Sequence, residues 1–323
     1  MPSIFAKKGT SKNKGRKGSN FAGLALHGDS LRYLELSGGR GSLRVVKQEI
    51  VPISRGAIIK DSLVDLEMII SSLENLKSTV GGFSCPVVLG VPSRDVILRL
   101  VEYPKMSIED VKEALQFEFD KYFPYPYAEA AADVAEVEVP APEAAEKSIV
   151  LVATCRQRII YDVVRATSRV GINLAAVEPM NVAFFRAAIG PDSRSGSYFV
   201  VFVEPESTQI MLGYKDNGIL FRSTAVDLTV REVRDSDEGI MPILRDVQNT
   251  IIFASNQYRG LEPNHLILGG VVGKDSRLGT LLESGASLTV IPLDVWDLWR
   301  TPSLVGNVSG FEAAFGLAVR NLL

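Results

Sequence analysis

The sequence predicts an α/β fold built from two domains. Its 323 residues exceed what one small core usually organises. Stretches with the two-residue period of strands alternate with stretches of helical period. Two segments, Phe21–Leu36 and Tyr198–Gly213, share one layout of a β run, a short polar turn and a second β run. Because this layout opens two separate parts of the chain, we expect two similar halves.

The first half is predicted to continue with a third strand and a covering helix. Ser42–Pro52 alternates like a strand that follows the first hairpin. Ser62 is then expected to cap a helix that ends at Gly81 and Gly82. Its apolar residues follow helical spacing: Leu63, Leu66, Ile69, Ile70, Leu73 and Leu76. Pro86–Val91 is a nearly continuous apolar run, typical of a central strand covered on both faces.

Residues 95–177 change to the order strand, helix, strand, strand, helix, strand. Ser107 and Asp110 have the spacing of a capping box at the start of the first helix. The other predicted elements are strands at Asp95–Val101, Asp133–Val139, Ser148–Thr154 and Asn173–Val177, with a second helix from about Arg156 to Arg169. This series predicts an inserted βαββαβ subdomain.

A polar break at Pro191–Ser197 precedes the second half. After the second hairpin we expect a strand at Ile219–Ala225, a helix at Gly239–Tyr258, a strand at Asn264–Leu268 before Gly269 and Gly270, and a closing helix at Gly310–Leu322. The predicted boundaries are 1–18 for a basic disordered arm, 19–94 for the first half, completed by 178–194 and 310–323, 95–177 for the insert, and 195–309 for the second half.

Composition excludes several classes of protein. No apolar run approaches the roughly 18 residues that span a bilayer, and the N-terminus lacks a signal peptide's apolar core, so we expect a cytoplasmic protein. The two cysteines, Cys85 and Cys155, lie in apolar strand-like contexts and are expected to be buried free thiols. With only two histidines and no carboxylate cluster, no metal site is expected.

Residues 1–18 contain six basic residues and no acidic one: Lys7, Lys8, Lys12, Lys14, Arg16 and Lys17. Such an arm is either attracted to anionic lipid or a solvated lead-in to the first strand. Nucleic acid is not an expected partner, because the arm lacks interleaved aromatics and the rest of the chain is acidic.

Two hairpins that open two similar halves are typical of the actin-like (ribonuclease H-like) fold, which binds nucleotide phosphates between its halves. A phosphate turn favours glycine, whose backbone lets several N–H groups point at the anion. Here the first turn is Leu26–Ser30, and the second contains Glu204, Pro205 and Glu206. These residues add negative charge and remove a donor, so we expect the fold with part of its phosphate chemistry lost.

The most specific string, Glu118–Pro126, is a helix end followed by two prolines and several aromatic residues. With the preceding capping box it resembles the PilM family of type IV pilus assembly proteins. The resemblance extends from Phe21 onward and includes Gly56–Asp61, Val88–Pro92, Gly171–Pro179, Ile219–Arg222 and Ala313–Leu322. Members are cytoplasmic actin-like proteins in which a βαββαβ subdomain replaces one actin subdomain.

The resemblance implies a scaffold that binds the cytoplasmic tail of PilN, a bitopic inner-membrane protein, and joins the pilus platform to cytoplasmic machinery. A location at the cytoplasmic face of the inner membrane and contacts with other platform proteins are also implied. Aromatic residues of the string are expected to border the groove for the tail: Phe119, Tyr122, Phe123, Tyr125 and Tyr127. The alternatives are a cytoplasmic component of a type II secretion platform and a nucleotide-binding FtsA-like protein. A sugar kinase would require a catalytic acid and intact phosphate turns, which are not visible.

Compared with family members that bind ATP, several nucleotide positions are replaced. Ala25 and Phe202 stand where each hairpin has an Asp, and His27 and Glu204 stand at glycine positions. The candidates for a degenerate nucleotide cleft are Asp29, Ser30, Arg32, Ser207, Thr208, Gln209, Gly269 and Gly270. Gly269 and Gly270 match the adenosine-side turn, and a strand-to-helix turn that needs glycine geometry explains them equally well. We expect no ATP hydrolysis and at most weak binding of ATP or ADP.

Overall fold

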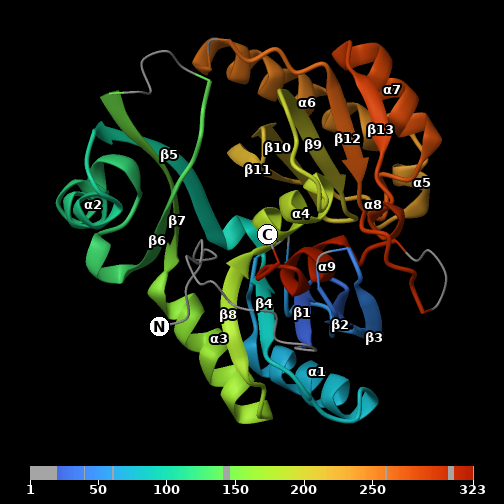
Figure 1. The fold of residues 1–323 in the computed structure, drawn as a ribbon. Helices are drawn as coiled ribbons and strands as arrows, with labels where there is room; N and C mark the ends of the chain where they lie inside the picture. Colours follow the sequence, from blue (N-terminus) through green and yellow to red (C-terminus); the bar gives the residue numbers. More distant parts are fainter. Residues whose placement is uncertain are drawn as a thin grey trace. The chain divides into compact units, whose positions relative to one another are not determined.

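A computed structural model describes residues 20–39, 41–59, 62–140, 146–258, 260–304 and 309–322. The predicted basic arm, 1–18, lies outside these residues. Within them the chain forms two five-stranded sheets, one three-stranded sheet and surrounding helices, which confirms the predicted α/β class (Figure 1).

By contact the chain divides into two compact units. Of the described residues, those up to 95 combine with those in 158–192 and 294–323 to form the first unit, and those in 96–157 and 193–293 form the second. The boundaries inferred from sequence stay predictions. In the described part of the chain, no helix is both long enough and apolar enough to cross a membrane.

The first unit is built on a sheet with the strand order β3-β2-β1-β4-β8. Its strands are β1 (Phe21–Leu26), β2 (Ser30–Ser37), β3 (Arg44–Pro52), β4 (Val87–Val91) and β8 (Leu174–Pro179). The first three strands are antiparallel neighbours, whereas β4 runs parallel to β1 and β8 parallel to β4. All five residues of β4 are buried, as its continuous apolar run predicts.

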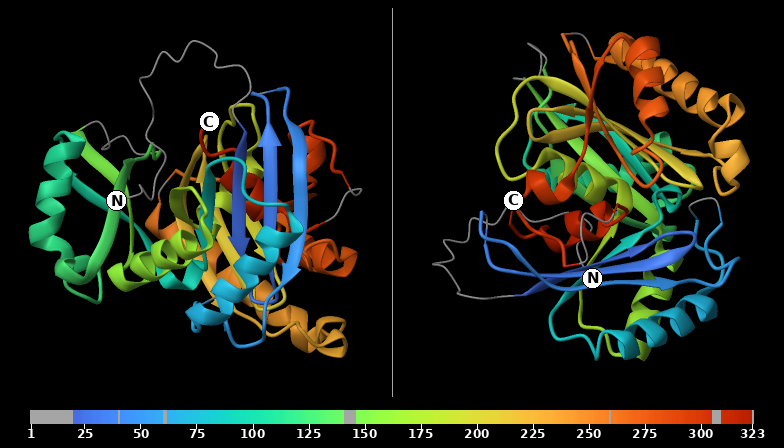
Figure 2. Two further views of the ribbon diagram at one scale, coloured as in Figure 1. Left: turned by 90° about the horizontal axis from the view of Figure 1, so that it is seen from below. Right: turned by 90° about the vertical axis from the view of Figure 1, so that its right-hand side faces the viewer.

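Helices cover both faces of this sheet. The helices of the unit are α1 (Leu66–Thr79), α3 (Gln157–Val170), α4 (Met180–Ile189), α8 (Val295–Leu298) and α9 (Glu312–Ala318). Figure 2 (right) shows α1 on one side of β1 to β3 and the red α9 on the other. A Cβ atom on Gly316 would lie 1.9 Å from the Ala183 carbonyl oxygen, so α9 and α4 approach closely because this position is glycine.

The predicted start of α1 was wrong. Asp65, not Ser62, is the N-cap, and its carboxylate accepts a hydrogen bond from Met68 N (3.1 Å). The Ser62 hydroxyl instead donates to Asp95, which also accepts from Leu63 N at 2.7 Å. The local pattern assigned the Ser62 hydroxyl to the helix cap, but this hydroxyl bonds to Asp95, a carboxylate distant in sequence.

The second unit contains a sheet with the equivalent order, β11-β10-β9-β12-β13. Its strands are β9 (Ser197–Val203), β10 (Ser207–Tyr214), β11 (Asn217–Ala225), β12 (His265–Gly269) and β13 (Thr289–Pro292). The helices are α5 (Arg231–Arg234), α6 (Asp237–Gln257) and α7 (Ser276–Ala286), and α6 and α7 pack on each other and on the sheet. Directions match the first sheet, with an antiparallel β9-β10-β11 set and β12 and β13 parallel to β9.

The insert forms a separate three-stranded sheet with the order β5-β7-β6. It contains β5 (Val96–Pro104), α2 (Ile108–Tyr122), β6 (Ala130–Glu136) and β7 (Lys147–Arg156), with a short 3₁₀ turn at Tyr127–Glu129. Another 3₁₀ turn, Ser93–Asp95, precedes β5. Followed by α3 and β8, this gives the predicted βαββαβ order, and its last strand joins the first sheet through β4. The predicted cap is confirmed, because the Ser107 hydroxyl accepts from Asp110 N at 3.2 Å.

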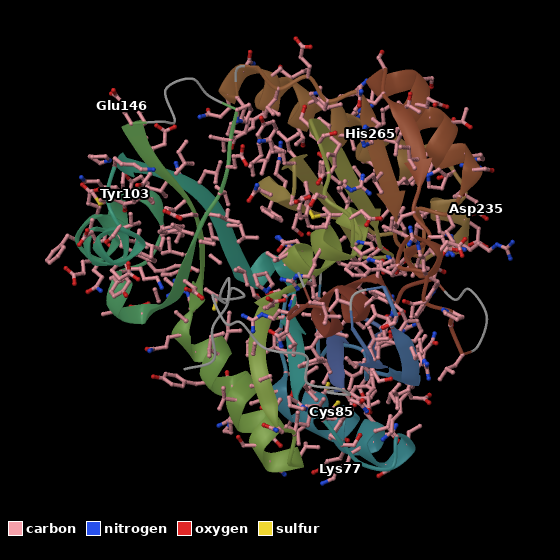
Figure 3. All side chains as sticks on the ribbon, viewed as in Figure 1. Lys77, Cys85, Tyr103, Glu146, Asp235 and His265 are labelled. Atoms are coloured by element: carbon pink, nitrogen blue, oxygen red, sulfur yellow. The ribbon has the colours of Figure 1, made fainter. Side chains whose placement is uncertain are left out.

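Both cysteines are free and buried, as predicted from their apolar contexts. Cys85, labelled in Figure 3, lies just before β4 beside Tyr33. Burial, with a smaller contribution from Glu35, raises the pKa of the Cys85 thiol to about 11. The thiol is therefore protonated and unreactive at neutral pH.

Candidate functional site

The turn between β1 and β2 is a tight hairpin. His27 N donates to the Ser30 carbonyl oxygen at 3.0 Å, and Ile53 N, just after β3, donates to the Asp29 carbonyl oxygen at 3.0 Å. Ala25 pairs with Arg32 across the hairpin. The backbone therefore places Asp29, Ser30 and Arg32, three predicted site residues, around one turn.

Arg32 occupies the interior of this turn with a buried guanidinium. Its Nε atom donates to Ser30 Oγ at 3.2 Å, and Nη1 donates to the Gly310 carbonyl oxygen at 2.7 Å. Nη2 lies 3.5 Å from Asp29 Oδ1, although the Asp29 side chain is 63% exposed. Arg32 thus donates hydrogen bonds to groups of its own unit, and it links the hairpin to the segment before α9.

His27, at the position of a phosphate-turn glycine, is also buried. Burial, and then the nearby Arg32 cation, lower the pKa of His27 well below its usual value. The imidazole is therefore neutral at physiological pH. Its ring meets Phe184 edge to face, with centroids 6.2 Å apart.

The turn between β9 and β10 repeats the first hairpin. Glu204 N donates to the Ser207 carbonyl oxygen at 2.9 Å, and Val226 N, just after β11, donates to the Glu206 carbonyl oxygen at 3.1 Å. Phe202 pairs with Gln209 across this hairpin, as Ala25 pairs with Arg32 across the first. The two turns are therefore equivalent residue by residue.

Polar side chains at the start of β10 are buried. Gln209 Nε2 donates to Ser207 Oγ at 3.2 Å and to Ser223 Oγ at 3.0 Å. Thr208 is fully buried beside them in sequence. Ser207, Thr208 and Gln209 thus lie together at the start of β10, with Gln209 bonded within its own unit.

The replacements at the second turn pack on the two predicted glycines. A Cβ atom on Gly269 would lie 2.6 Å from the Phe202 ring, and one on Gly270 would lie 2.5 Å from the Val203 carbonyl oxygen. Gly270 also has a φ of +93°, which glycine tolerates best. Glu204 Oε1 accepts from Val271 N at 3.3 Å. Close packing against Phe202 and Glu204 is therefore sufficient to explain both glycines.

The turns offer little that could hold phosphate or metal. His27 and Glu204 use their backbone N–H groups within the hairpins, and position 205 is a proline. Glu204 and Glu206 also bring two carboxylates to the second turn, and a carboxylate repels an anion. Among the described residues, no group of three or more His, Cys, Asp or Glu residues is arranged to hold a metal ion.

The predicted aromatic residues of the insert divide into buried and accessible ones. Phe119 and Phe123 are buried in the core of the insert with Val111 and Leu115. Their ring centroids lie 4.6 Å apart, and Tyr127 meets Phe119 edge to face at 5.3 Å. Phe119 and Phe123 therefore hold the segment in shape and present little surface.

Tyrosines, prolines and arginines form the accessible part of this segment. Tyr127 is 37% exposed, Tyr122 and Tyr125 are partly exposed, and Pro124 and Pro126 are exposed. The Arg156 guanidinium lies 5.0 Å from the Tyr125 ring centroid, and Arg99 Nη1 donates to the Tyr122 carbonyl oxygen at 3.0 Å. We call Tyr122, Tyr125 and Tyr127, with the two prolines, the tyrosine-proline surface.

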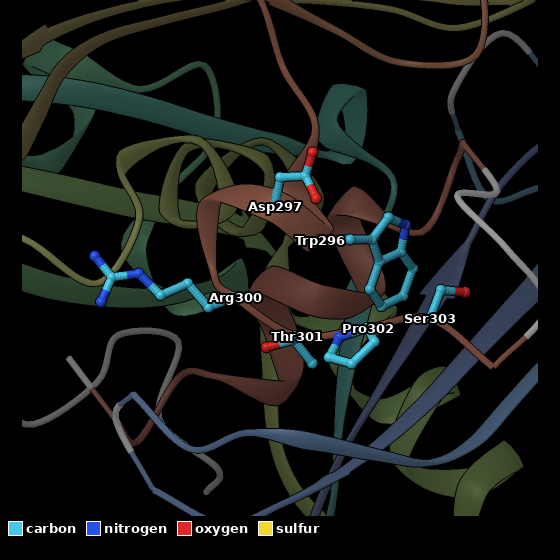
Figure 4. Close-up of a pocket in the computed structure, with 6 residues that line it drawn as sticks. All are labelled: Trp296, Asp297, Arg300, Thr301, Pro302 and Ser303. Atoms are coloured by element: carbon cyan, nitrogen blue, oxygen red, sulfur yellow. The ribbon is translucent and has the colours of Figure 1, made fainter.

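A hollow that the sequence did not predict lies along α8 and the residues just after it. Its volume is about 430 Å³, and it is lined by Trp296, Asp297, Arg300, Thr301, Pro302 and Ser303 (Figure 4). The buried Trp299 anchors the segment by donating from Nε1 to the Ala187 carbonyl oxygen at 2.9 Å. Arg300 has a φ of +51° and lies 3.9 Å from Asp192. The two tryptophans close together, Trp296 and Trp299, are the sequence signal that could have indicated it.

The paired sheets, each opened by a hairpin, place the protein in the class of actin-like folds. The family model of the type IV pilus assembly protein PilM matches residues 23–190. The chain therefore belongs to the PilM family.

Several solved structures are similar to this chain. A PilM-PilN type IV pilus biogenesis complex has a TM-score of 0.77 and 21% identity, over 94% of this chain and 98% of that chain. The ethanolamine utilization protein EutJ from Carboxydothermus hydrogenoformans has a TM-score of 0.50 and 11% identity, over 93% and 89%. The cytoplasmic domain of EpsL from the Vibrio cholerae type II secretion system has a TM-score of 0.48 and 14% identity, over 78% and 82%.

Proposed function

We propose that this protein is a scaffold of type IV pilus assembly that binds the cytoplasmic tail of a PilN-like inner-membrane protein. Family membership supports the role in pilus assembly, and a structure similar to this chain is described as a PilM-PilN complex. The observation that carries the proposal for the tail is the tyrosine-proline surface. Its rings are fixed on a buried aromatic core, so they can bind an apolar peptide with little loss of side-chain entropy.

The proposal divides the five aromatic residues by role. Tyr122, Tyr125 and Tyr127 contact the tail, whereas Phe119 and Phe123 keep the segment folded. The guanidiniums of Arg156 and Arg99 lie over the rings of Tyr125 and Tyr122 and help to orient them. Truncation of one anchoring ring is expected to cost about 2 kcal/mol of binding free energy, or about thirtyfold in affinity.

A titration of the full chain with a synthetic peptide of the partner's cytoplasmic tail tests this proposal. Tyr127→Ala and Tyr125→Ala should each weaken binding, while Phe253→Ala, which removes an exposed ring on α6, should leave it unchanged. Circular dichroism would check that each variant is folded. Unchanged affinity in folded Tyr125→Ala and Tyr127→Ala proteins would refute the role of this surface.

We further propose that the scaffold works without ATP hydrolysis. Support comes from Arg32, His27 and Glu204, which fill the two turns with side chains bonded or packed inside their own units. Weak binding of ATP or ADP is compatible with this role, whereas turnover is not. Calorimetric titration with ATP and magnesium, together with a phosphate-release assay, should give weak or no binding and no release; tight magnesium-dependent binding would contradict the proposal.

We also propose that the protein acts at the cytoplasmic face of the inner membrane, with the basic arm in contact with anionic lipid. The arm's six cations support this, since each basic residue near an anionic surface contributes about 1 kcal/mol. Flotation with vesicles containing anionic lipid should carry the full chain and lose most of it when residues 1–18 are deleted. Equal flotation of both proteins would remove the arm from the proposal.

A further inference from the structure

Helix α2 presents an unusual outward face. Phe117 is 89% exposed, although the opposite side of the helix packs Val111, Leu115 and Phe119 into the core of the insert. Three exposed acids lie on the same face, at positions i−8, i−4 and i+3 from Phe117: Glu109, Glu113 and Asp120. None of them forms an ion pair with another described residue, because Lys112 pairs with Asp133 and Lys121 with Glu118. We call this the acidic α2 face.

Helix α3 presents a face of opposite charge. Tyr161 is 55% exposed, and Arg158, Arg165 and Arg169 lie on the same side of the helix with exposed side chains. Arg158 and Arg165 share one partner, Asp162, each at 3.5 Å, and Arg169 contacts Glu67 at 2.9 Å. Two guanidiniums on a single carboxylate leave a positive excess. We call this the basic α3 face.

These two helices are the extremes of charge among the described helices. Helix α2 contains five acidic and two basic residues, whereas α3 contains three arginines and one aspartate. Each carries one exposed aromatic ring in the middle of its charged face. An α2 face cannot pair with another α2 face, because acids would oppose acids.

The spacing of the two faces matches in one orientation. The acids of α2 are separated by four and then seven residues, and the arginines of α3 by seven and then four. Antiparallel alignment therefore brings all charged positions into register over about 16 Å of helix. The opposing residues are Glu109 with Arg169, Glu113 with Arg165, Phe117 with Tyr161, and Asp120 with Arg158. If the two helices ran parallel, the acidic positions of α2 and the arginine positions of α3 would not all lie opposite one another.

We propose that the acidic α2 face of one copy binds the basic α3 face of a second copy, as an antiparallel helix pair. Three pairs of opposite charges and one aromatic pair would be buried in each contact. An interface of two helix faces is small, so the association is weak and depends on a high local concentration, as on an assembly platform. Exposed charges dominate it, so added salt weakens it.

Sedimentation velocity of the full chain, over a concentration series at low and high salt, tests the pairing. The natural chain should associate more strongly at low salt. Glu113→Arg and Arg165→Glu should each weaken association about tenfold, since a reversed charge replaces attraction with repulsion at one central pair. A chain that carries both changes again has opposite charges at this pair, with the two signs exchanged. Association should therefore return to within about threefold of the natural chain.

Two further variants make the result specific. Phe117→Ala should weaken association, whereas Ile252→Glu, at an exposed apolar residue of α6, should not. Binding of the PilN-like tail should be unchanged in every variant, which shows that each protein is folded and separates this proposal from the proposed function.

Several results would overturn the pairing. These are a natural chain that stays monomeric throughout, single reversals that associate as well as the natural chain, or a double reversal no better than either single one. Weakening by Glu113→Arg but not by Arg165→Glu would mean that another basic surface binds α2, and would also reject the proposal.

Discussion

The two hairpin turns, residues 26–32 and 203–209, follow one backbone plan and carry different side chains. In both, the first turn residue donates its N–H to the carbonyl oxygen three residues later, and the residue after the third strand donates to the turn. In both, the residue that begins the second strand, Ser30 or Ser207, accepts from the residue two positions on. That donor is a cationic Arg32 in the first turn and a neutral Gln209 in the second.

The difference lies in what each turn is bonded to. Arg32 reaches the carbonyl oxygen of Gly310, whereas Glu204 receives the N–H of Val271. The first turn is thus held by a hydrogen bond from the Arg32 cation to a carbonyl oxygen. The second is held by a hydrogen bond from a backbone N–H group to the Glu204 carboxylate. Equivalent backbones are therefore held by charges of opposite sign, and these charges stand at different positions of the two turns.

The largest effect is expected from Gly270→Ala in the second unit. The added Cβ atom would lie 2.5 Å from the Val203 carbonyl oxygen at a φ of +93°, so we expect a loss of about 3 kcal/mol of unfolding free energy. Gly279→Ala, in α7 where a Cβ atom meets nothing closer than 4.0 Å, should be neutral or slightly stabilising. Urea denaturation of both variants makes the comparison; equal stabilities would mean that the turn relaxes.

Arg32→Met tests whether the first turn depends on its cation. The change keeps an apolar stem and removes the hydrogen bonds to Ser30 and Gly310, so we expect a loss of about 2 kcal/mol. Arg222→Met, which removes a half-buried arginine bonded to Thr250 at 3.2 Å, provides a control with a smaller cost. An Arg32→Met protein as stable as the natural chain would show that the guanidinium contributes nothing.

His27 should make the first turn sensitive to acid. Since the pKa of His27 is lowered in the folded state, the unfolded chain binds the proton first as the pH falls below about 6.5. The contribution of His27 to the free energy of unfolding is therefore present in full above that pH. Below it, the contribution decreases by up to about 1.4 kcal/mol per pH unit.

Urea denaturation at pH 7 and pH 5 checks this expectation. His27→Gln should lose less stability between the two values than the natural chain. His265→Gln is the control. Burial, and then Arg194, also lower the pKa of His265, but this histidine is more accessible than His27. Identical pH dependence in the natural chain and His27→Gln would show that His27 is already protonated or accessible to water.

The smallest effect is expected from Gln209→Ala in the second turn. Two neutral hydrogen bonds, to Ser207 and Ser223, are lost, at a cost of about 1 kcal/mol. The comparison with Arg32→Met shows how much more the two bonds of the cationic side chain contribute than the two bonds of the neutral one. A larger loss for Gln209→Ala than for Arg32→Met would reverse the order that we derive from charge.

Sequence patterns with short range predicted their structures well. The two hairpins, the βαββαβ order and the Ser107 cap depend on residues close in sequence, and all are confirmed. Between Gly270 and Gly310 no element was predicted, and the structure places α7, β13 and α8 there. Both β13 and α8 have only four residues, too few to show a period.

The same limit explains the site. Sequence comparison identified Ala25, His27, Phe202 and Glu204 as replacements, but not what their side chains contact. Sequence alone does not distinguish Phe119 and Phe123 from the three tyrosines, because aromatic residues in one string are alike in sequence. Only packing separates the two buried rings from the accessible tyrosine-proline surface.

The sequence by itself determined the α/β class, the duplicated hairpin, the insert and the family, since these follow from local periodicity and from a specific string of residues. The tertiary structure decided which groups satisfy the turns: Gly310 for Arg32, Val271 for Glu204, and Asp95 for Ser62. The physical reason is that a buried charge or N–H group must find a partner wherever the fold brings one close, and such partners lie far away in sequence.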